Sequence, residues 1–224
     1  TAASAGVFVL EQADWQDSAL RPRHLLSHAD FRDLFSASYL AADVQLAVGE
    51  QTILFTDMVG STAFYATHGD PTAFARVKQH FDELFAIVKS HHGVVIKTIG
   101  DACMAAFIEP LHAVRAAEAM HHAFSPSRAD LPVQLRITLN TGPCIAVRLN
   151  SKLDYFGGTV NVCAKLQSLA ESWQITMGQP TLDGPGVRAY LAERGVALES
   201  LSYTSGALPS PIPAYRWNVY PSRG

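Results

Sequence analysis

The chain has 224 residues, long enough for one large domain with an appended segment, and a second catalytic unit is not expected. Its formal net charge of −3, without any basic stripe along the sequence, argues against a nucleic-acid-binding surface. Three widely spaced cysteines that form no CxxC pattern, no apolar run long enough to span a bilayer and no signal pattern after Thr1 favour a soluble, cytoplasmic piece of a longer protein that makes no membrane contact through this segment.

Residues 1–49 differ in pattern from the rest of the chain, and we expect them to be a linker or the tail of an upstream domain. Within this segment, residues 7–10 are compatible with a short strand, and Ser27 to Asp30 form a capping box that predicts a helix to about residue 40. From residue 50 to 224, strands and helices are expected to alternate. The apolar run at 52–57 lacks alternation, which predicts a central strand covered on both faces.

The helix and hairpin that follow this strand are marked by their end residues. Asp70 and Pro71 are an N-cap and a first-turn proline, so a helix is expected from there to about Gly93. Two β runs are joined through Gly100 and Asp101, which predicts a hairpin with Asp101 at its turn. The elements predicted from the hairpin onward are strands at 94–98 and 102–107, a helix from 110, strands at 135–140 and 145–149 around a turn at 141–143, a helix from 159 to about 170, a strand near 175–177, a helix near 187–194, and strands near 198–203 and 214–219.

The order of these elements indicates the α+β class. A strand, a helix, a strand hairpin, a helix and a strand follow one another as in a ferredoxin-like βαββαβ sandwich, here with additional C-terminal strands and a helix. In that fold the first strand and the hairpin can be neighbours. Asp57, at the end of the first strand, and Asp101, at the hairpin turn, are therefore expected to converge.

Asp57 and Asp101 are the first candidates for chemistry, because each ends an apolar run. A carboxylate at the end of a buried strand is costly unless a cation meets it, and two of them suggest a two-metal site for phosphoryl or nucleotidyl transfer. A single aspartate there is more often a cap or turn residue, but the pairing reverses that preference. The adjacent turn can hold phosphate oxygens through its N–H groups. This turn consists of Val59, Gly60, Ser61 and Thr62.

Four motifs in order resemble those of the class III nucleotidyl cyclases, the adenylate and guanylate cyclase family. Each motif alone would be a weak signal, but four at suitable spacing are a strong one. The resemblance covers about residues 51–220, so that residues 50–224 would be a class III cyclase catalytic domain. The motifs are Phe55-Thr-Asp-Met-Val-Gly-Ser-Thr62, Lys97-Thr-Ile-Gly-Asp-Ala102, Leu135-Arg-Ile-Thr-Leu-Asn-Thr-Gly-Pro143 and Asp154-Tyr-Phe-Gly-Gly-Thr-Val-Asn161.

The resemblance implies a metal-dependent reaction. Asp57 and Asp101 match the family's two metal-binding aspartates, and the Met58 carbonyl is an expected further ligand. Together they would hold two Mg²⁺ or Mn²⁺ ions between the ribose 3′-hydroxyl and the triphosphate, where the ions activate the hydroxyl and neutralise charge as pyrophosphate leaves. The attack is intramolecular, so positioning contributes much of the catalysis.

The resemblance also implies a nucleotide. Lys97 and Asp154 match the positions from which adenylate cyclases read the base. A lysine can donate to adenine N1 and a carboxylate can accept from the 6-amino group, whereas a guanine reader needs nearly the opposite pattern. ATP is therefore the expected substrate. In isolation Lys97 would be a strand-end surface lysine and Asp154 a loop-start aspartate, and only their joint match favours a functional role.

Further residues would position the ribose and the phosphates. Asn161 and Lys165 are four apart on a predicted helix and share a face. In the family this pair is an asparagine that orients the ribose and an arginine that stabilises the transition-state phosphate. Lysine keeps the charge but loses the bidentate fork, which lowers the expected rate about tenfold. Arg136 matches a family arginine on the triphosphate, whereas Ser205-Gly206 stands where the family often has a lysine.

Family active sites form between two catalytic domains, and this chain carries both halves, so a head-to-tail homodimer is expected. The leading hypothesis is an adenylate cyclase that makes 3′,5′-cyclic AMP and pyrophosphate from ATP for cyclic nucleotide signalling, downstream of a sensory domain. Because of Lys165 and the missing lysine, one alternative is a degenerate cyclase domain that serves as a nucleotide-binding dimerisation or regulatory module. Another is a cyclase for GTP or a pyrimidine nucleotide.

Overall fold

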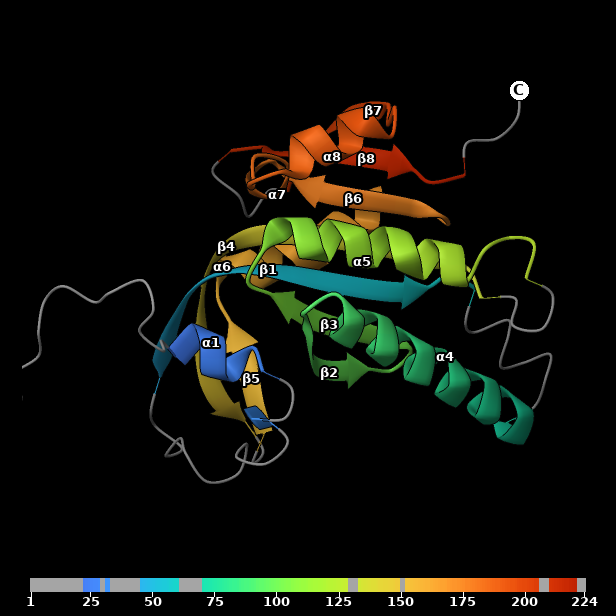
Figure 1. Ribbon diagram of the computed structural model, residues 1–224, viewed down its shortest axis with the longest axis horizontal. Helices are drawn as coiled ribbons and strands as arrows, with labels where there is room; N and C mark the ends of the chain where they lie inside the picture. The colour runs from blue at the N-terminus through green and yellow to red at the C-terminus, as the bar shows by residue number, and fades with distance from the viewer. Residues whose placement is uncertain are drawn as a thin grey trace, which may run out of the picture.

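The computed structural model describes residues 22–28, 31–32, 45–60, 70–128, 133–149, 152–205 and 210–220, which form an eight-stranded sheet with flanking helices (Figure 1). The strands are β1 Leu46–Met58, β2 Val94–Ile99, β3 Ala102–Phe107, β4 Leu135–Leu149, β5 Lys152–Phe156, β6 Gln174–Gly178, β7 Leu198–Tyr203 and β8 Ile212–Asn218. The helices are α1 Pro22–Leu26, α4 Asp70–Ser90, α5 Pro110–Ala123, α6 Gly158–Leu166, α7 Gln179–Leu182 and α8 Val187–Glu193, with a 3₁₀ turn at Gln167–Leu169.

The centre of the sheet has the predicted ferredoxin-like arrangement. β1 lies between β3 and β4 and is antiparallel to both, and β2 pairs with β3, so these strands follow the order β2-β3-β1-β4. The sheet continues through β6, β8 and β7, with β6 parallel to β4. This confirms the predicted α+β fold with additional C-terminal strands. The predicted helix near 187–194 is α8, whereas the short α7 before it was not predicted.

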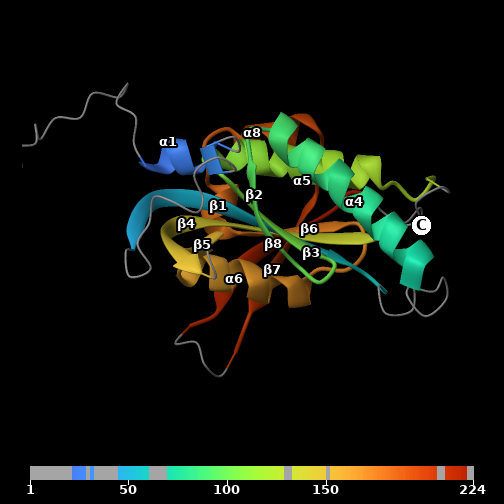
Figure 2. The same cartoon turned by 90° about the horizontal axis from the view of Figure 1, so that it is seen from below.

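Helices cover both faces of β1 (Figure 2). α4 and α5 lie on one face, where Leu54 shares a buried cluster with Leu84 and Val114. α6 lies on the other face, where Ile53 shares a second cluster with Cys163. Because successive side chains of a strand point to opposite faces, a strand buried on both sides shows no polar alternation, and the prediction of a central strand is confirmed. None of the described helices is long and apolar enough to cross a membrane.

The predicted turn at 141–143 is wrong, because β4 is one continuous strand that pairs with β1 over residues 135–146. Pro143 is tolerated because its carbonyl accepts the Thr159 hydroxyl of α6, at 2.8 Å. The N and O atoms of one residue in an antiparallel strand point to the same side. The nitrogen of Pro143 therefore points to the same side as its oxygen, which bonds to α6, and its lack of a hydrogen removes no bond to β1. Gly142 is needed for the close packing of α6 and not for a turn, since a Cβ there would lie 2.7 Å from Thr159 Oγ1.

The predicted helix from Ser27 to about residue 40 is only partly described. α1 ends before Ser27, which lies in a turn, and Phe31 and Arg32 are helical. Residues 33–44 and the predicted strand at 7–10 lie outside the described part of the chain. β1 begins at Leu46, ahead of the apolar run, because its first residues pair with the distal half of β4.

Two buried histidines are expected to make the domain sensitive to acid. His80 on α4 and His121 on α5 have no exposed surface. Within the described ranges, neither ring nitrogen of His80 has a hydrogen-bonding partner, and Nδ1 of His121 has none either. Burial lowers the pKa of each side chain from its ordinary value of 6.5 to about 4.

The lowered pKa values set the sign of the effect. As the pH falls below about 6.5, the unfolded chain binds protons at both positions while the folded domain does not, so the free energy of unfolding decreases until about pH 4. The expected loss is on the order of 3 kcal/mol per histidine. Urea unfolding at neutral pH and at about pH 4 should show it. His80→Phe should reduce this loss of stability, whereas replacement of the exposed His92 by asparagine should not. A loss in His80→Phe equal to that of the wild type would contradict this account.

Candidate active site

The register of the sheet brings Asp57 and Asp101 to the same end. Thr56 of β1 lies opposite Cys103 of β3, so Asp57 lies opposite the first residue of β3 and beside the β2–β3 turn. Gly100 in that turn has a φ of +62°, which glycine adopts at little cost. Asp101 Oδ2 is buried and has no hydrogen-bonding partner in the described part of the chain.

The two aspartates fit a divalent metal. A buried carboxylate oxygen without a partner is costly unless a cation meets it, and hard cations such as Mg²⁺ and Mn²⁺ prefer oxygen ligands. Among the described residues, no three His, Cys, Asp or Glu side chains gather around one point. Mg²⁺ is commonly held by one or two carboxylates together with substrate phosphates and water. The donor set therefore suits ions that arrive with a nucleotide, with the Met58 carbonyl at the end of β1 as a further oxygen.

Arg136 is the partner of Asp57 in this structure. It lies directly across the β1–β4 pair, its Nε donates to Asp57 Oδ2 at 2.6 Å, and a second guanidinium nitrogen contacts the same oxygen. Oδ1 of Asp57 has no hydrogen-bonding partner among the described residues. Arg136 was expected on the triphosphate, and its ion pair with Asp57 was not predicted, because spacing along the sequence does not reveal it.

The turn after β1 is described only as far as Gly60. Val59 is 39% exposed, and its N–H donates to Gln134 O at 2.8 Å, so this amide is already bonded. Gly60 has a φ of +76°, the left-handed region that favours glycine. A role of this turn in phosphate binding stays a prediction. Outside the described residues lie Ser61, Thr62 and Gly206.

Lys97 and Asp154, which are 57 residues apart, form an ion pair. Lys97 Nζ donates to Asp154 Oδ2 at 2.6 Å, and the main-chain N–H of Tyr155 donates to Oδ1 at 2.8 Å. Asp154 is 8% exposed, so these two donors offset the cost of burying its charge. The structure thus places the two expected base-reading residues side by side.

Asp154 lies in β5 and not at the start of a loop, which corrects the sequence analysis. Residues 152–156 pair with the end of β4 and contact β2, which carries Lys97. A five-residue run with a central aspartate has little strand signal, because aspartate is depleted in strands. The strand forms because β4 continues past Pro143 and supplies its partner.

Asn161 and Lys165 lie one turn apart on α6, as predicted. Asn161 is exposed and Lys165 is half-buried, and neither side chain bonds to another described residue. The helix is held on the sheet by the Thr138 hydroxyl, which donates to Cys163 O at 3.0 Å. α6 therefore presents both side chains from a fixed support.

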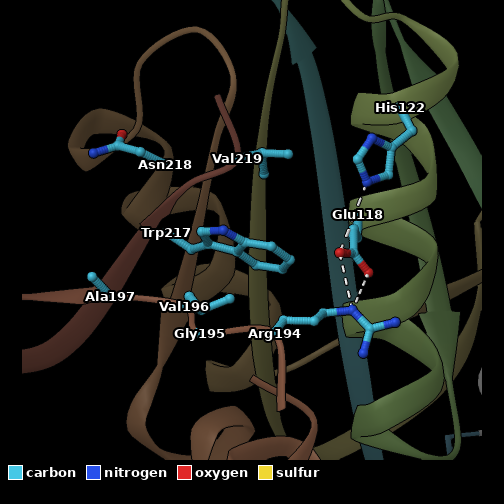
Figure 3. A pocket seen from close by; sticks show the side chains of 9 residues that line it. All are labelled: Glu118, His122, Arg194, Gly195, Val196, Ala197, Trp217, Asn218 and Val219. Atoms are coloured by element: carbon cyan, nitrogen blue, oxygen red, sulfur yellow. Dashed lines mark hydrogen bonds and ion pairs between the residues drawn. The ribbon is translucent and has the colours of Figure 1, made fainter. Parts of the chain in front are cut away.

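A pocket of about 430 Å³ lies away from these residues, between α5, α8 and the end of β8 (Figure 3). Its lining includes Glu118, His122, Arg194 and Trp217, and none of the predicted site residues. Arg194 Nε donates to Glu118 at 3.2 Å, and His122 Nε2 lies 3.8 Å from the same carboxylate. The charged groups of the pocket thus face one another.

We place the candidate active site at the two aspartates and the Lys97–Asp154 pair.

Residues 45–184, more than half of the chain, match the model of the adenylate and guanylate cyclase catalytic domain. The chain belongs to this family. The matched range contains every residue that the sequence analysis placed in the site.

Relatives of this cyclase domain include both nucleotide classes. The receptor-type adenylate cyclase ESAG 4 of Trypanosoma brucei brucei is 23% identical over 218 residues, covering 77% of this chain and 17% of that protein. Guanylate cyclase D of Mus musculus is 28% identical over 197 residues, covering 72% and 17%. The chain thus spans less than a fifth of the length of these curated relatives. One relative is an adenylate cyclase and the other a guanylate cyclase, so these relatives do not distinguish ATP from GTP as the substrate.

The fold agrees with solved cyclase structures. The crystal structure of the adenylyl cyclase CyaB from P. aeruginosa has a TM-score of 0.65 and 18% sequence identity, covering 78% of this chain and 95% of that chain. At this identity the likeness supports the fold alone.

Proposed function

We propose that the domain is an adenylate cyclase, which converts ATP to 3′,5′-cyclic AMP and pyrophosphate. The observation that carries this proposal is the Lys97–Asp154 pair at 2.6 Å. An ammonium group beside a carboxylate offers a donor next to an acceptor, and adenine presents N1, an acceptor, next to its 6-amino donor. Guanine presents the reverse order, a donor at N1 and an acceptor at O6, so the proposal requires Lys97 to face N1 and Asp154 to face the 6-position of the base.

The metal half of the site consists of Asp57, Asp101 and the Met58 carbonyl, which would hold two Mg²⁺ or Mn²⁺ ions. Cyclase domains of this family generally use divalent metal ions. When bound, such ions lower the pKa of the ribose 3′-hydroxyl and neutralise charge on the triphosphate. Asp101 contributes an oxygen that no donor in the described chain occupies.

The other half of the site orients the nucleotide. Asn161 would hold the ribose, and Lys165 would place a positive charge on the phosphate that is attacked. Arg136 pairs with Asp57 and balances its charge. In the proposed complex it would contact the triphosphate of the bound nucleotide. Both ends of the new bond belong to one molecule, so this positioning supplies much of the rate.

The proposed active form is a head-to-tail homodimer with two equivalent sites. Each site would take Asp57 and Asp101 from one chain and Lys97, Asp154, Asn161 and Lys165 from the other. One chain carries both sets, which supports a symmetric dimer. Specific activity should therefore rise with protein concentration.

The direct test is turnover of ATP by the purified chain with Mn²⁺. The proposal predicts cyclic AMP and pyrophosphate in equal amounts. A folded, dimeric protein that makes no cyclic nucleotide would overturn the enzymatic function and leave the degenerate, nucleotide-binding module. Preferential turnover of GTP or a pyrimidine nucleotide would show that the assignment of the base is wrong.

Replacement of Lys165 by arginine separates the enzyme from the degenerate module. Lys165→Arg restores a planar bidentate donor, and we expect kcat to rise about tenfold. A matched control is Lys89→Arg, because Lys89 also lies in the last turn of a helix, on α4. ATP binding without turnover in the wild type, and no recovery of turnover in Lys165→Arg, would favour a domain that binds nucleotide without converting it.

We also propose that residues 1–49 connect the domain to an upstream sensory domain and that the domain acts in the cytoplasm. The length of the curated relatives, of which this chain spans less than a fifth, supports a larger assembly. Limited proteolysis of the natural full-length protein would test the connector, since cleavage within residues 1–49 should release an intact cyclase domain.

A further inference from the structure

The segment that precedes β1 is bound to the strand that carries Asp154. Arg32 is 7% exposed, and one of its terminal nitrogens donates to the main-chain oxygen of Leu153 at 2.8 Å. Its guanidinium carbon lies 5.5 Å from the centroid of the Tyr155 ring. Leu153 and Tyr155 are the two neighbours of Asp154 in sequence. Arg32 therefore contacts the residue on each side of the carboxylate that pairs with Lys97.

β5 depends on such contacts because it is an edge strand. In the described sheet it pairs with β4 alone, so the main-chain groups of its other edge bond to no strand. Arg32 satisfies one of these groups, the oxygen of Leu153. A second link comes from Tyr155, which is 1% exposed and whose hydroxyl donates to Leu26 O of α1 at 3.4 Å.

The two faces of β5 have different contacts. Leu153 and Tyr155 belong to a buried apolar cluster that also contains Leu26. Successive side chains of a strand point to opposite faces, so Asp154 points away from this cluster, and its carboxylate meets Lys97. The N-terminal segment thus holds one side of the strand, and the base-reading pair occupies the other.

We propose that Arg32 is a positioning residue for the nucleotide base. This inference rests on the proposed function, in which Lys97 and Asp154 read adenine. Arg32 holds the main chain of β5 at Leu153 and the ring of Tyr155, one on each side of Asp154, and thereby keeps the carboxylate in register with Lys97. A displacement of the segment at 22–32 would pass through β5 to the base-reading pair, which makes this segment a route from an upstream signal to base recognition.

Arg32→Met tests this role in the full chain, because methionine keeps a buried unbranched side chain and removes the guanidinium. We expect the KM for ATP to rise about tenfold and the preference for ATP over GTP to fall about tenfold, with kcat changed less than about twofold. Arg32→Lys keeps a donor for Leu153 O without the planar fork, so its KM for ATP and its preference for ATP should lie between those of the wild type and of Arg32→Met. The matched control is Arg194→Met. The guanidinium carbon of Arg194 lies 3.6 Å from the centroid of the Tyr190 ring, and its loss should change neither the KM for ATP nor the preference for ATP over GTP.

Amide hydrogen exchange gives a second measurement that needs no turnover. Arg32→Met should speed exchange at residues 153–156 and leave β3 unchanged. A purely structural role for Arg32 predicts lower stability and a lower kcat at an unchanged preference for ATP. That result, or unchanged exchange in β5, overturns the proposal.

Failure of the proposed function would give a different pattern. If the wild type makes no cyclic nucleotide, adenylate cyclase activity is refuted, and calorimetric affinities for ATP and GTP replace KM as the test of Arg32. A smaller loss of ATP preference in Arg32→Met than about twofold by that measurement also overturns the positioning role. If Arg32→Met does not fold, Arg32→Lys is judged by the same criteria.

Discussion

The Asp101→Asn variant is expected to lose cyclase activity by at least about a thousandfold while being no less stable than the wild type. An amide is a poor ligand for a hard cation, so the metal half of the site would be lost. The stability should stay the same or rise by about 1 kcal/mol, because Asp101 Oδ2 is buried without a hydrogen-bonding partner in the described chain and an amide removes its charge.

This combination of effects distinguishes a functional carboxylate from a structural one. Turnover of ATP and thermal unfolding would be measured on the same preparations. Asp183→Asn is the control, because Asp183 is an exposed aspartate that pairs with Arg188, and it should keep full activity. A clear fall in the melting temperature of Asp101→Asn, or more than about a tenth of the activity remaining, would contradict a metal-binding role.

The second large effect is expected at the Lys97–Asp154 pair. Lys97→Met and Asp154→Asn should each lower kcat/KM for ATP about a hundredfold, and the double variant should lose about as much as either single variant, because the two residues act as a unit. The preference for ATP over GTP should fall in all three. Lys97→Met should also cost about 1 kcal/mol of stability, a modest value because the lysine side chain is 36% exposed.

An exposed pair of the same chemistry provides the control. Lys78 and Asp82 lie 3.9 Å apart on α4 with most of their surface exposed, so Lys78→Met and Asp82→Asn should leave both activity and preference unchanged. Stability that falls in Lys97→Met while the ratio of ATP to GTP turnover stays at the wild-type value would reduce the pair to a structural ion pair. Additive losses in the double variant would show that the two residues act separately.

The central fold could be predicted from local signals, and the error at β4 shows where such signals fail. Helix caps and apolar runs marked α4, the β2–β3 hairpin and β1, because these features depend on neighbouring residues. Thr141-Gly142-Pro143 has the composition of a turn, but the tertiary partner α6 decides its conformation: Pro143 O accepts from Thr159, and Gly142 makes room for it. Once β4 was broken in two, β5 had no partner strand and was missed as well.

The residues of the candidate site could be proposed from the sequence, whereas most of their contacts could not. Asp57 and Asp101 could be paired from the fold, since strand order alone brings the end of β1 to the hairpin. The identity of Lys97 and Asp154 came from resemblance, and no spacing rule predicts that residues so far apart in sequence should meet. The contact of Arg136 with Asp57 depends on the register of β1 and β4, which side-chain pattern does not fix for a pair buried on both faces.

The most direct measurement offers ATP, GTP, CTP and UTP together, at equal concentrations with Mn²⁺, to the purified chain and to Asp101→Asn, and quantifies each cyclic product. The account predicts that cyclic AMP predominates with the wild type and that Asp101→Asn makes none of the four products. A wild type that makes no cyclic nucleotide, or that makes another one in preference to cyclic AMP, would contradict it.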